Sequence, residues 1–567
     1  MGLCLAYYDV TGIQNYIFQS NELKNNTGAS FLVYETLSNF LPKALKEVVK
    51  PSALVSDWIN PVEFKLLDPN AGIQAEVIYI GGGNAMVAYA QKQVAVADNT
   101  QLSCIISEKA LGLQCVSVII EEEGKDFNED RHKLVQALKE KKQSMPQNYK
   151  LMGLSIDELC PQTKLPVSVY INESQRLPNQ ITDINEGRFL PRETYLKRNF
   201  ADNQEHYYSW LDINSDMYSL PLQFENLGSQ DGESRIGVIH IDGNSMGKNI
   251  ENIMKDISDY EQAIHRMRKL SHAIDVQYKN AMKTVLKAVE ESCEKGKLGE
   301  IKLGQELASD KHYLPVRPLV INGDDITFVC DGRLALPLTE LFLQEISKST
   351  VKIDDDEFKL SACAGVAIVK TKFPFYRAYE LAENCCKNAK KRAKWFANEY
   401  EQEVGSWLDF QVIFGGPKTE LELHRISHYS TVDKIVQEFD GLKSFSLLWR
   451  PWRIGTLESL TDKEVKYAFE HFKTVMNCLL LGTDCKAWPR SKLKKLRSKY
   501  LEGKLSVKQF LSEMRSRGCL LPDITDFGGL DQLFKEGFDF ALHTPYFDVI
   551  EVMDLWQPLK ERVSGNE

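Results

Sequence analysis

Two apolar segments that favour β-strands flank the sequence Asn-Gly-Asp-Asp at residues 322–325. Asn and Gly accept the positive φ angles that a two-residue hairpin turn needs, so residues 319–329 are predicted to form a β-hairpin. A turn needs only one polar side chain for solubility, yet two carboxylates, Asp324 and Asp325, stand side by side here. Alone, this pattern is equally typical of a solvated Asp-rich turn. A second feature is needed before the hairpin indicates a function.

That feature is a buried strand at residues 236–242, which ends in Asp242 and runs into a loop of small residues. If this strand pairs with the hairpin, the three carboxylates meet at one edge of a sheet. Carboxylates at close range repel one another unless a cation lies between them. Oxygen ligands without a nearby His or Cys cluster favour Mg²⁺ or Mn²⁺ over zinc. Asp242, Asp324 and Asp325 are therefore the predicted metal ligands and catalytic residues, with Asp242 and Asp324 as the first-choice pair.

The loop after Asp242 is predicted to bind phosphates. Its small residues leave backbone N–H groups free to face an anion at the start of the next helix. Together with the acidic cluster, this loop predicts the palm of a nucleotidyltransferase that works by two-metal phosphoryl transfer. The residues expected to contact the nucleotide here are Gly243, Asn244, Ser245, Met246, Gly247 and Gly323.

The first 415 residues repeat one order of predicted elements. Such an order predicts an α+β fold in which an antiparallel, ferredoxin-like sheet carries helices on one face. The repeat indicates a duplication in which Asp9 corresponds to Asp242 and residues 81–84 correspond to residues 322–325. The predicted elements are strand 3–10, helix 29–50, hairpin 76–90, helix 93–111 and strand 114–121, then strand 236–242, helices across 248–296, hairpin 317–330, helix 334–348, strand 360–369, helix 375–398 and strand 408–414.

The two copies differ in their chemistry. The first copy keeps Asp9 but has no carboxylate in its turn, Gly81-Gly82-Gly83-Asn84. One aspartate is a poor anchor for two metal ions, so the first copy is expected to bind a nucleotide without performing the transfer. The alternative is that residues 81–84 form only a tight turn. The residues expected to bind nucleotide in this copy are Thr11, Gly12, Ile13, Gln14, Gly82, Gly83 and Asn84.

Length and charge set the wider organisation. A chain of 567 residues is too long for one core. The net charge of −10 predicts that any polynucleotide contact is local or made through partner proteins. No apolar run is long enough for a membrane span, and the 12 cysteines lack C-x-x-C spacing, so reduced thiols in a cytoplasmic protein are expected. The predicted domains are a first palm at 1–125, a helical insert at 126–232, a second palm at 233–415 and an α-helical C-terminal domain at 416–567.

Several motifs resemble the large polymerase-like subunit of type III CRISPR effector complexes, particularly the Cmr branch. The resemblance implies two palm domains of the nucleotide-cyclase or GGDEF type, a helical insert and a helical C-terminal domain. It also implies a subunit that works with other Cmr-type subunits, guide RNA and target RNA, and that uses ATP to make a second messenger, usually a cyclic oligoadenylate. The motifs occur in family order and are Asp9–Phe18, Gly81–Asn84, Asp242–Gly247, Gly323–Asp325, Ala364–Ala367, Tyr379–Glu383, Ala389–Lys394 and Ser406–Phe410.

The sequence departs from this family in three respects. No His-Asp pair precedes the first palm, so the DNA-cleaving HD nuclease of many relatives is not expected. Only Cys160 remains where relatives often have a zinc site, so no zinc is expected. Asn322 and Asn244 replace a usual Gly and a frequent Asp, which leaves the acidic triad intact. Members without the nuclease also join AMP to another acceptor, such as S-adenosylmethionine, so the product stays open.

A lysine-rich helix at residues 384–398 is a candidate for neutralising the triphosphate. Lys387, Lys391 and Lys394 share one helix face, and the family's phosphate-contacting helix favours Lys387 and Lys391. The alternative is a solvated basic helix, which is also one of two interpretations of the basic run at 490–497; the other is contact with RNA or an acidic subunit. His240 is expected to be a core histidine.

Two other functions remain open from the sequence. One is a catalytically silent scaffold subunit, and the other is a stand-alone cyclic-nucleotide synthase.

Overall fold

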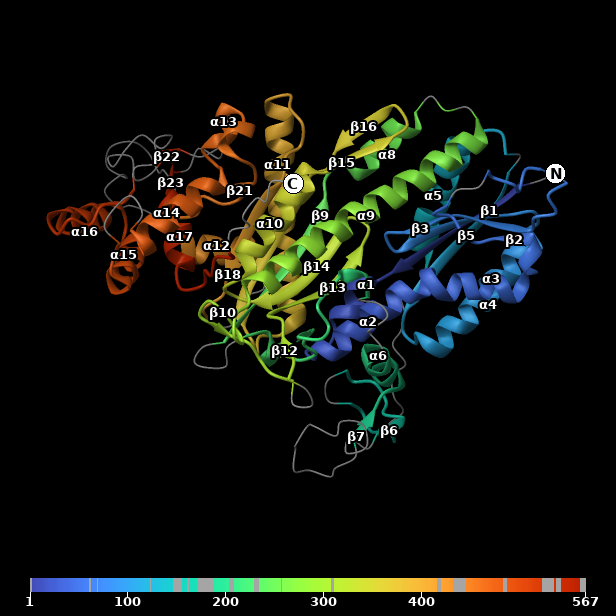
Figure 1. Cartoon of the computed structure of the whole chain (residues 1–567), viewed down its shortest axis with the longest axis horizontal. Helices are drawn as coiled ribbons and strands as arrows, with labels where there is room; N and C mark the ends of the chain where they lie inside the picture. Colours follow the sequence, from blue (N-terminus) through green and yellow to red (C-terminus); the bar gives the residue numbers. More distant parts are fainter. Residues whose placement is uncertain are drawn as a thin grey trace.

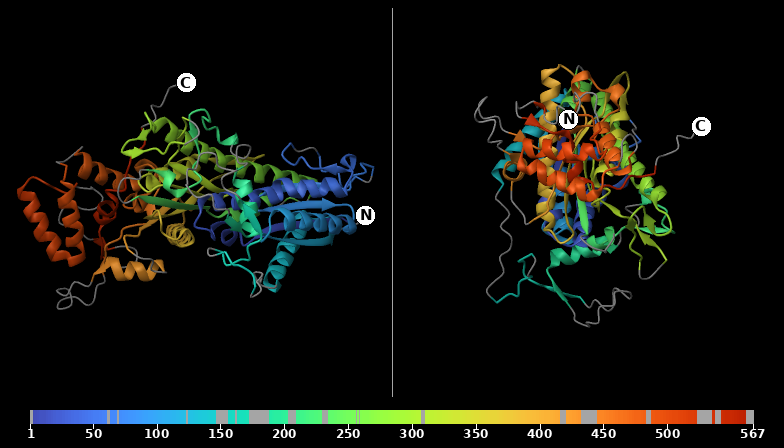
Figure 2. Two further views of the ribbon diagram at one scale, coloured as in Figure 1. Left: turned by 90° about the horizontal axis from the view of Figure 1, so that it is seen from below. Right: turned by 90° about the vertical axis from the view of Figure 1, so that its left-hand side faces the viewer.

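Two mixed α+β units and a mainly helical C-terminal region lie side by side along the long axis of the molecule (Figure 1). The first unit contains the N-terminus, and the helices of the C-terminal region lie at the opposite end (Figure 2). This computed structural model describes residues 3–60, 63–68, 70–122, 124–145, 156–160, 163–171, 188–202, 209–228, 234–255, 257, 259–306, 310–415, 420–431, 445–482, 487–522, 535–536 and 542–560.

The first palm is built on a sheet with the strand order β2-β3-β4-β1-β5. Strand β1 lies between β4 and β5 and is antiparallel to both. Helix α2 begins at Leu23, earlier than the predicted helix at 29–50. The polar residues that open α2 are buried under helix α6, a tertiary contact that hydrophobic periodicity does not reveal. The elements are β1 (Leu3–Thr11), α1 (Ile13–Phe18), α2 (Leu23–Glu35), α3 (Leu41–Val48), β2 (Leu54–Val55), β3 (Ala75–Gly81), β4 (Asn84–Tyr89), α4 (Lys92–Lys109), β5 (Gln114–Glu122) and α6 (Arg192–Asp202).

The second palm has the strand order β13-β14-β9-β17-β18-β21. Its first four strands form the antiparallel, ferredoxin-like sheet that the sequence predicts, and β18 then joins parallel to β17. The elements are β9 (Arg235–Gly243), α8 (Met246–Met254), α9 (Tyr260–Ser292), β13 (Val316–Asn322), β14 (Asp325–Asp331), α10 (Ala335–Lys348), β17 (Ala362–Lys370), α11 (Phe375–Glu399), β18 (Trp407–Val412) and β21 (Trp452–Arg453).

Helices cover both faces of the second sheet, so the prediction of helices on one face is wrong. Ile239 and Ile241 of β9 belong to the core formed with α9 and α10, whereas Val238 belongs to the core that includes Tyr379 of α11. Successive strand residues point to opposite faces, so α11 lies opposite α9 and α10. Nearly every residue of β9 is buried, which is typical of a strand covered on both sides.

The two sheets repeat one pairing register. Asp9 lies opposite Asn84 on β4, and Asp242 lies opposite Asp325 on β14. The register shifts between Val77 and Tyr79 in the first hairpin, and between Pro318 and Val320 in the second. The residue before the following helix is left-handed in both copies, at Gly12 (φ 66°) and Ser245 (φ 57°). These shared irregularities agree with the predicted duplication and with its residue correspondence.

Helix α5 (Phe127–Ser144) belongs with the first palm in space. It contacts β5 and β1, just as α11 contacts β17 and β9. The predicted boundary at residue 125 therefore separates a helix from the sheet that it covers. Past α5, the described part of the insert includes helix α6 and a small hairpin of β6 (Val169–Ile171) and β7 (Arg188–Leu190).

The turns of the two hairpins touch each other. A Cβ atom at Gly83 would lie 3.0 Å from Asn322 Nδ2, and one at Gly323 would lie 3.3 Å from the Cα of Gly82. Each palm also packs a helix against the sheet of the other: α9 of the second palm packs on β3, and α2 of the first palm packs on β13. The two hairpin turns therefore belong to one interface between the palms.

Exchanging Arg268 for Met is expected to destabilise this interface. The Arg268 guanidinium, buried on α9, donates to Glu76 Oε1 at 2.8 Å and to the carbonyl oxygen of Val77 at 2.9 Å. Removing it leaves a buried carboxylate that keeps only the backbone N–H groups of Lys65 and Leu66. We expect a loss of about 3 kcal/mol in the free energy of unfolding, measured by chemical denaturation. An unchanged value would show that the pair does not hold the palms together.

The C-terminal region packs on the second palm through β21, which pairs with β18. Its main helices are α12 (Leu421–Tyr429), α14 (Phe469–Leu481), α15 (Arg490–Glu502), α16 (Lys504–Ser516) and α17 (Pro545–Val552). The basic run at 490–497 lies on α15, where Arg490 and Lys494 pair with Asp554 at 3.3 and 3.1 Å. These ion pairs favour the structural interpretation of that run for these two side chains.

Two further predictions from the sequence concern membrane spans and the state of the cysteines. None of the helices in the described segments has both the length and the apolar character needed to cross a bilayer. Among the described cysteines, Cys478 is in a disulfide, against the expectation of reduced thiols throughout, and the others are thiols.

Candidate active site in the second palm

Asp242 and Asp325 face each other at the ends of two adjacent strands. They are direct partners in the antiparallel register of β9 and β14, so their side chains project from the same face of the sheet. Helix α11 covers that face. The predicted convergence of the first strand and the hairpin is therefore present, but the residues opposite each other are Asp242 and Asp325.

Asp324 lies on the other side of the strand end. A Cβ atom at Gly243 would lie 2.8 Å from Asp324 Oδ2 and 2.7 Å from the hydroxyl oxygen of Tyr278 on α9. The sequence analysis names Asp242 and Asp324 as the first-choice metal ligands, whereas the strand register sets Asp242 opposite Asp325. Within the described segments, no three His, Cys, Asp or Glu side chains are arranged so that they could enclose an ion.

The cluster carries excess negative charge. Burial, and then the charges of Asp242, Asp324 and Glu383, raise the pKa of Asp325 from its usual 3.8 to about 7. Asp325 Oδ1 is buried without a hydrogen-bond partner. Burial and the charge of Asp242 also raise the pKa of Asp324. These carboxylates therefore lack a positive partner that would make the fully ionised state favourable.

His240 is a core residue, as expected. Its side chain is buried below Asp325, with Nδ1 3.5 Å from Asp325 Oδ1 and 3.4 Å from Thr327 Oγ1. Burial lowers its pKa to about 4, so the ring is neutral near pH 7. It therefore does not neutralise the carboxylates.

Lys390 of α11 is the lysine that reaches the strand ends. Its Nζ lies 2.6 Å from Asp242 Oδ2 and donates to the carbonyl oxygen of Gly243 at 2.9 Å. Lys387, one turn earlier, pairs with Glu383 at 3.0 Å, and Lys391 is exposed. The sequence analysis favoured Lys387 and Lys391 because of the resemblance to the family's phosphate-contacting helix. Helical spacing defines a face of the helix, but it does not show which face meets the sheet.

The predicted phosphate loop turns directly from β9 into α8. Ser245 adopts a left-handed conformation before α8, and Ser245 and Gly247 are exposed while Met246 is half-buried. Asn244 is buried, and its side chain donates to Ser361 Oγ and to the carbonyl oxygen of Gly405. Asn244 thus fixes the loop through its side chain, and the start of α8 carries the donors suited to an anion.

The first palm repeats part of this arrangement. Lys142 of α5 lies 2.6 Å from Asp9 Oδ2, in the place that Lys390 takes beside Asp242. Gln14 donates to Glu383 Oε1 at 3.3 Å, which links the start of α1 to the helix over the second site. Thr11 ends β1, Gly12 connects the strand to the helix, and Ile13 opens α1. Gly82 and Gly83 form the turn that faces the second hairpin, and Asn84 begins β4. Sequence reasoning missed Lys142 and Glu383: α5 is distant from Asp9 in the chain, and Glu383 is visible only as part of a motif.

The residues present suit a divalent metal ion. Asp242 and Asp325 offer oxygen ligands on one face of the sheet. Oδ1 of Asp325 is buried without a hydrogen-bond partner, so a cation bound there would stabilise it. Hard oxygen ligands of this kind favour Mg²⁺ or Mn²⁺.

Exchanging Asp325 for Asn is expected to stabilise the metal-free protein at pH 8. Because the folded carboxyl keeps its proton up to about pH 7 and the unfolded one only to 3.8, stability falls as the pH rises through this window. The side chain is 42% exposed, so solvent screening reduces the gain to about 1 kcal/mol. Thermal unfolding at pH 8 and pH 4 measures it, and the gain should vanish at pH 4.

Asp354→Asn is the matched control for this comparison. Its hydrogen bond and ion pair with Lys269 lower the pKa of Asp354, so the same substitution should not stabilise the protein at pH 8. Stabilisation by Asp354→Asn and not by Asp325→Asn would contradict the charge repulsion at the strand ends.

Fold and strand-end carboxylates together define a palm domain of the nucleotide-cyclase type. Residues 235–395 match the family described as Cas10/Cmr2, second palm domain, so this part of the chain is a Cas10-type palm. This confirms the family resemblance, although the shared description does not separate the predicted Cmr branch from others.

Solved structures with similar folds have low sequence identity. The Csm1–Csm4 cassette in complex with cA4 is 13% identical, with a TM-score of 0.48, and the match covers 98% of this chain and 70% of that chain. Csm1 in T. onnurineus is 12% identical, with a TM-score of 0.49, and the match covers 98% of this chain and 69% of that chain. No curated protein matches this chain.

Proposed function

We propose that this chain is the ATP-using nucleotidyltransferase subunit of a type III CRISPR effector complex. In this proposal it joins AMP units, or AMP and another acceptor, when target RNA is bound. The observation that carries the proposal is the direct pairing of Asp242 with Asp325 in a Cas10-type palm, with Lys390 in contact with Asp242. A scaffold has no need for a half-exposed carboxylate whose buried Oδ1 lacks a hydrogen-bond partner beside other carboxylates, because such a group costs stability.

The reaction is an attack of an acceptor hydroxyl on the α-phosphorus of ATP. A new P–O bond forms, the bond to pyrophosphate breaks, and the hydroxyl proton passes to solvent. Mg²⁺ or Mn²⁺ held by Asp242 and Asp325 would supply charge neutralisation for the triphosphate and the leaving pyrophosphate. Phosphoryl transfer needs mainly positioning and charge stabilisation from the protein.

The chain's own residues supply the rest of that environment. Lys390 exchanges its contact with Asp242 for a phosphate oxygen of ATP, and the backbone N–H groups of Met246 and Gly247 donate to the phosphates. The β1–α1 junction Thr11–Gln14 and the turn region Gly82–Asn84 of the first palm hold the acceptor. The carboxylate of Asp324, next to Asp325 in the chain, adds negative charge that attracts the same ion. The proposal includes other Cmr-type subunits as partners, a cytoplasmic location and no zinc.

The decisive experiment is an incubation of the full chain with labelled ATP and Mn²⁺. Parallel reactions add S-adenosylmethionine, or the guide-RNA complex with target RNA, and mass spectrometry identifies the products. Cyclic oligoadenylates would support the joining of AMP units to one another. An AMP–S-adenosylmethionine adduct would support the joining of AMP to another acceptor. Product from the chain alone, independent of RNA, would favour a stand-alone synthase. No product under any condition would refute the transferase and support a silent scaffold.

A further inference from the structure

Helix α11 is held at two places where it crosses the sheet. Below its middle lies Gly365 of β17, and a Cβ atom there would overlap the carbonyl oxygen of Ala382 and the backbone nitrogen of Cys386. This close approach fixes the distance of α11 from the sheet. One turn further along, Asn388 donates to Asp409 Oδ2 of β18 at 2.8 Å. That bond fixes the position of the helix along its own axis, two residues before Lys390.

The Asp409 carboxylate has its partners on two different parts of the chain. It is fully buried, and besides the Asn388 amide it accepts from Arg425 of α12 at 3.0 Å (Nη1 to Oδ2) and 2.9 Å (Nη2 to Oδ1). Arg425 also donates to Gln411 Oε1 and to the carbonyl oxygen of Phe410. Asp409 is therefore the point at which α11 and the C-terminal helix α12 meet through polar contacts.

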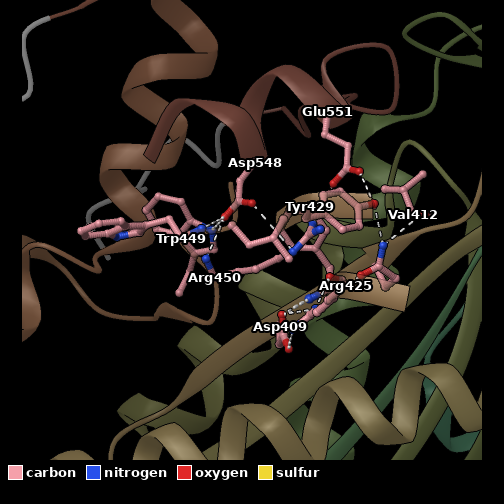
Figure 3. A network of polar contacts seen from close by, with 12 residues as sticks. Asp409, Val412, Arg425, Tyr429, Trp449, Arg450, Asp548 and Glu551 are labelled. Atoms are coloured by element: carbon pink, nitrogen blue, oxygen red, sulfur yellow. Dashed lines mark hydrogen bonds and ion pairs between the residues drawn. The ribbon is translucent and has the colours of Figure 1, made fainter. Parts of the chain in front are cut away.

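The network continues into the C-terminal region (Figure 3). Gln411 donates to the Tyr429 hydroxyl, and that hydroxyl donates to Glu551 Oε1 of α17 at 2.6 Å. Arg450 donates to Glu551 Oε2 at 2.9 Å, and the backbone N–H of Arg450 donates to Asp548 Oδ2 at 2.8 Å. A continuous chain of buried and partly buried hydrogen bonds thus runs from α17 to Asn388, close to the lysine beside Asp242.

We propose that Asn388, Asp409 and Arg425 are positioning residues through which the C-terminal region sets the place of Lys390 at the nucleotide site. The inference rests on the proposed ATP-dependent transfer. Asn388 and Arg425 touch neither Asp242 nor Asp325 in any contact that the structure shows; they act through α11. A shift of about 1 Å in a group that positions a phosphate is enough to cost roughly 100-fold in rate, so the placement of α11 has consequences for catalysis.

The test compares Asn388→Ala with Lys473→Met in the full chain. Asn388→Ala removes the bond to Asp409 and keeps a good helix former on α11. Lys473 of α14 pairs with Glu340 of α10 at 2.7 Å, so Lys473→Met also cuts a polar contact between the second palm and the C-terminal region, but on the face away from α11. Arg425→Lys, which keeps the charge and loses the paired geometry, is the conservative third variant.

Two readouts separate positioning from stability. We expect Asn388→Ala to speed amide hydrogen exchange in the Glu383–Lys391 segment and to raise the KM for ATP about 10-fold with a smaller change in kcat. Arg425→Lys should show a smaller change of the same kind, and Lys473→Met should leave both readouts as in the wild type. Equal effects of Asn388→Ala and Lys473→Met, or faster exchange without a change in KM, would overturn the proposal.

The failure of this inference differs from the failure of the proposed function. If the wild type forms no product, the transferase is refuted, and the KM comparison is replaced by the Kd for ATP with Mn²⁺. The hydrogen exchange of α11 then still decides whether Asn388 and Asp409 hold the helix, because that readout needs no turnover. Unchanged exchange in Asn388→Ala would reject the inference whether or not the protein is an enzyme.

Discussion

Asp242→Asn and Asp325→Asn are each expected to reduce the rate of product formation by at least about 1000-fold. Asparagine keeps the shape of aspartate and removes the negative charge, so the change acts on the metal ligand with little effect on packing. Both residues lie at strand ends, where they face one another across β9 and β14. The measurement is the initial rate of adenylate formation from ATP with Mn²⁺, with folding checked by thermal unfolding.

Asp356→Asn is the matched control for this pair. Asp356 is an exposed carboxylate on the β16 strand (Asp356–Lys359) that pairs with Arg266 at 2.7 Å. It should leave the rate within about twofold of the wild type, because surface ion pairs contribute little. Full activity in either Asp242→Asn or Asp325→Asn would show that these carboxylates are not the catalytic metal ligands.

Arg450→Met is expected to give the largest loss of stability, about 5 kcal/mol in the free energy of unfolding. The Arg450 side chain is fully buried, pairs with Glu551 at 2.9 Å and lies 3.8 Å from Asp548. Even with Arg450 present, burial raises the pKa of Asp548 to about 6. Removing the guanidinium takes the nearby cation from buried Asp548 and leaves buried Glu551 with Arg497 at 3.9 Å. Urea denaturation followed by tryptophan fluorescence measures the loss, because Trp449 and Trp452 lie beside Asp548.

Arg333→Met serves as its comparison. Arg333 pairs with Asp331 at 2.8 Å, but its side chain is 22% exposed, so water replaces part of the lost contact. A loss of only about 1 kcal/mol is expected. Equal losses for the two variants would show that burial does not govern the cost at Arg450.

The architecture of the second palm could be predicted because the sequence carries its signals locally. Apolar runs on both sides of residues 322–325 predicted the hairpin, and the strand ending at Asp242 predicted its neighbour. The duplication was also visible, since Asp9 and Gly12 occupy the same places as Asp242 and Ser245. Whether Asp242 lies opposite Asp324 or Asp325 depends on the strand register. A shift of one residue changes the partner, and the turn sequence alone does not fix the register.

Other parts of the site depend on tertiary contacts that leave no pattern in the chain. Lys390 and Lys391 are adjacent and chemically alike. The packing of α11 against Gly365 places Lys390, and not Lys391, in contact with Asp242. Lys142 meets Asp9 because α5 packs on the first sheet, beyond the domain boundary expected from composition. The polar network around Asp409 and Arg450 joins segments whose sequences show no shared periodicity.

The most direct test of the acidic site is a titration of the full chain with Mn²⁺, followed by electron paramagnetic resonance, in the presence of a non-hydrolysable ATP analogue. The wild type should bind Mn²⁺ with an affinity that rises when the analogue is added, and Asp325→Asn should lose about 10-fold or more of that affinity. Equal Mn²⁺ affinity in the wild type and in Asp325→Asn, with the analogue present, would contradict the account.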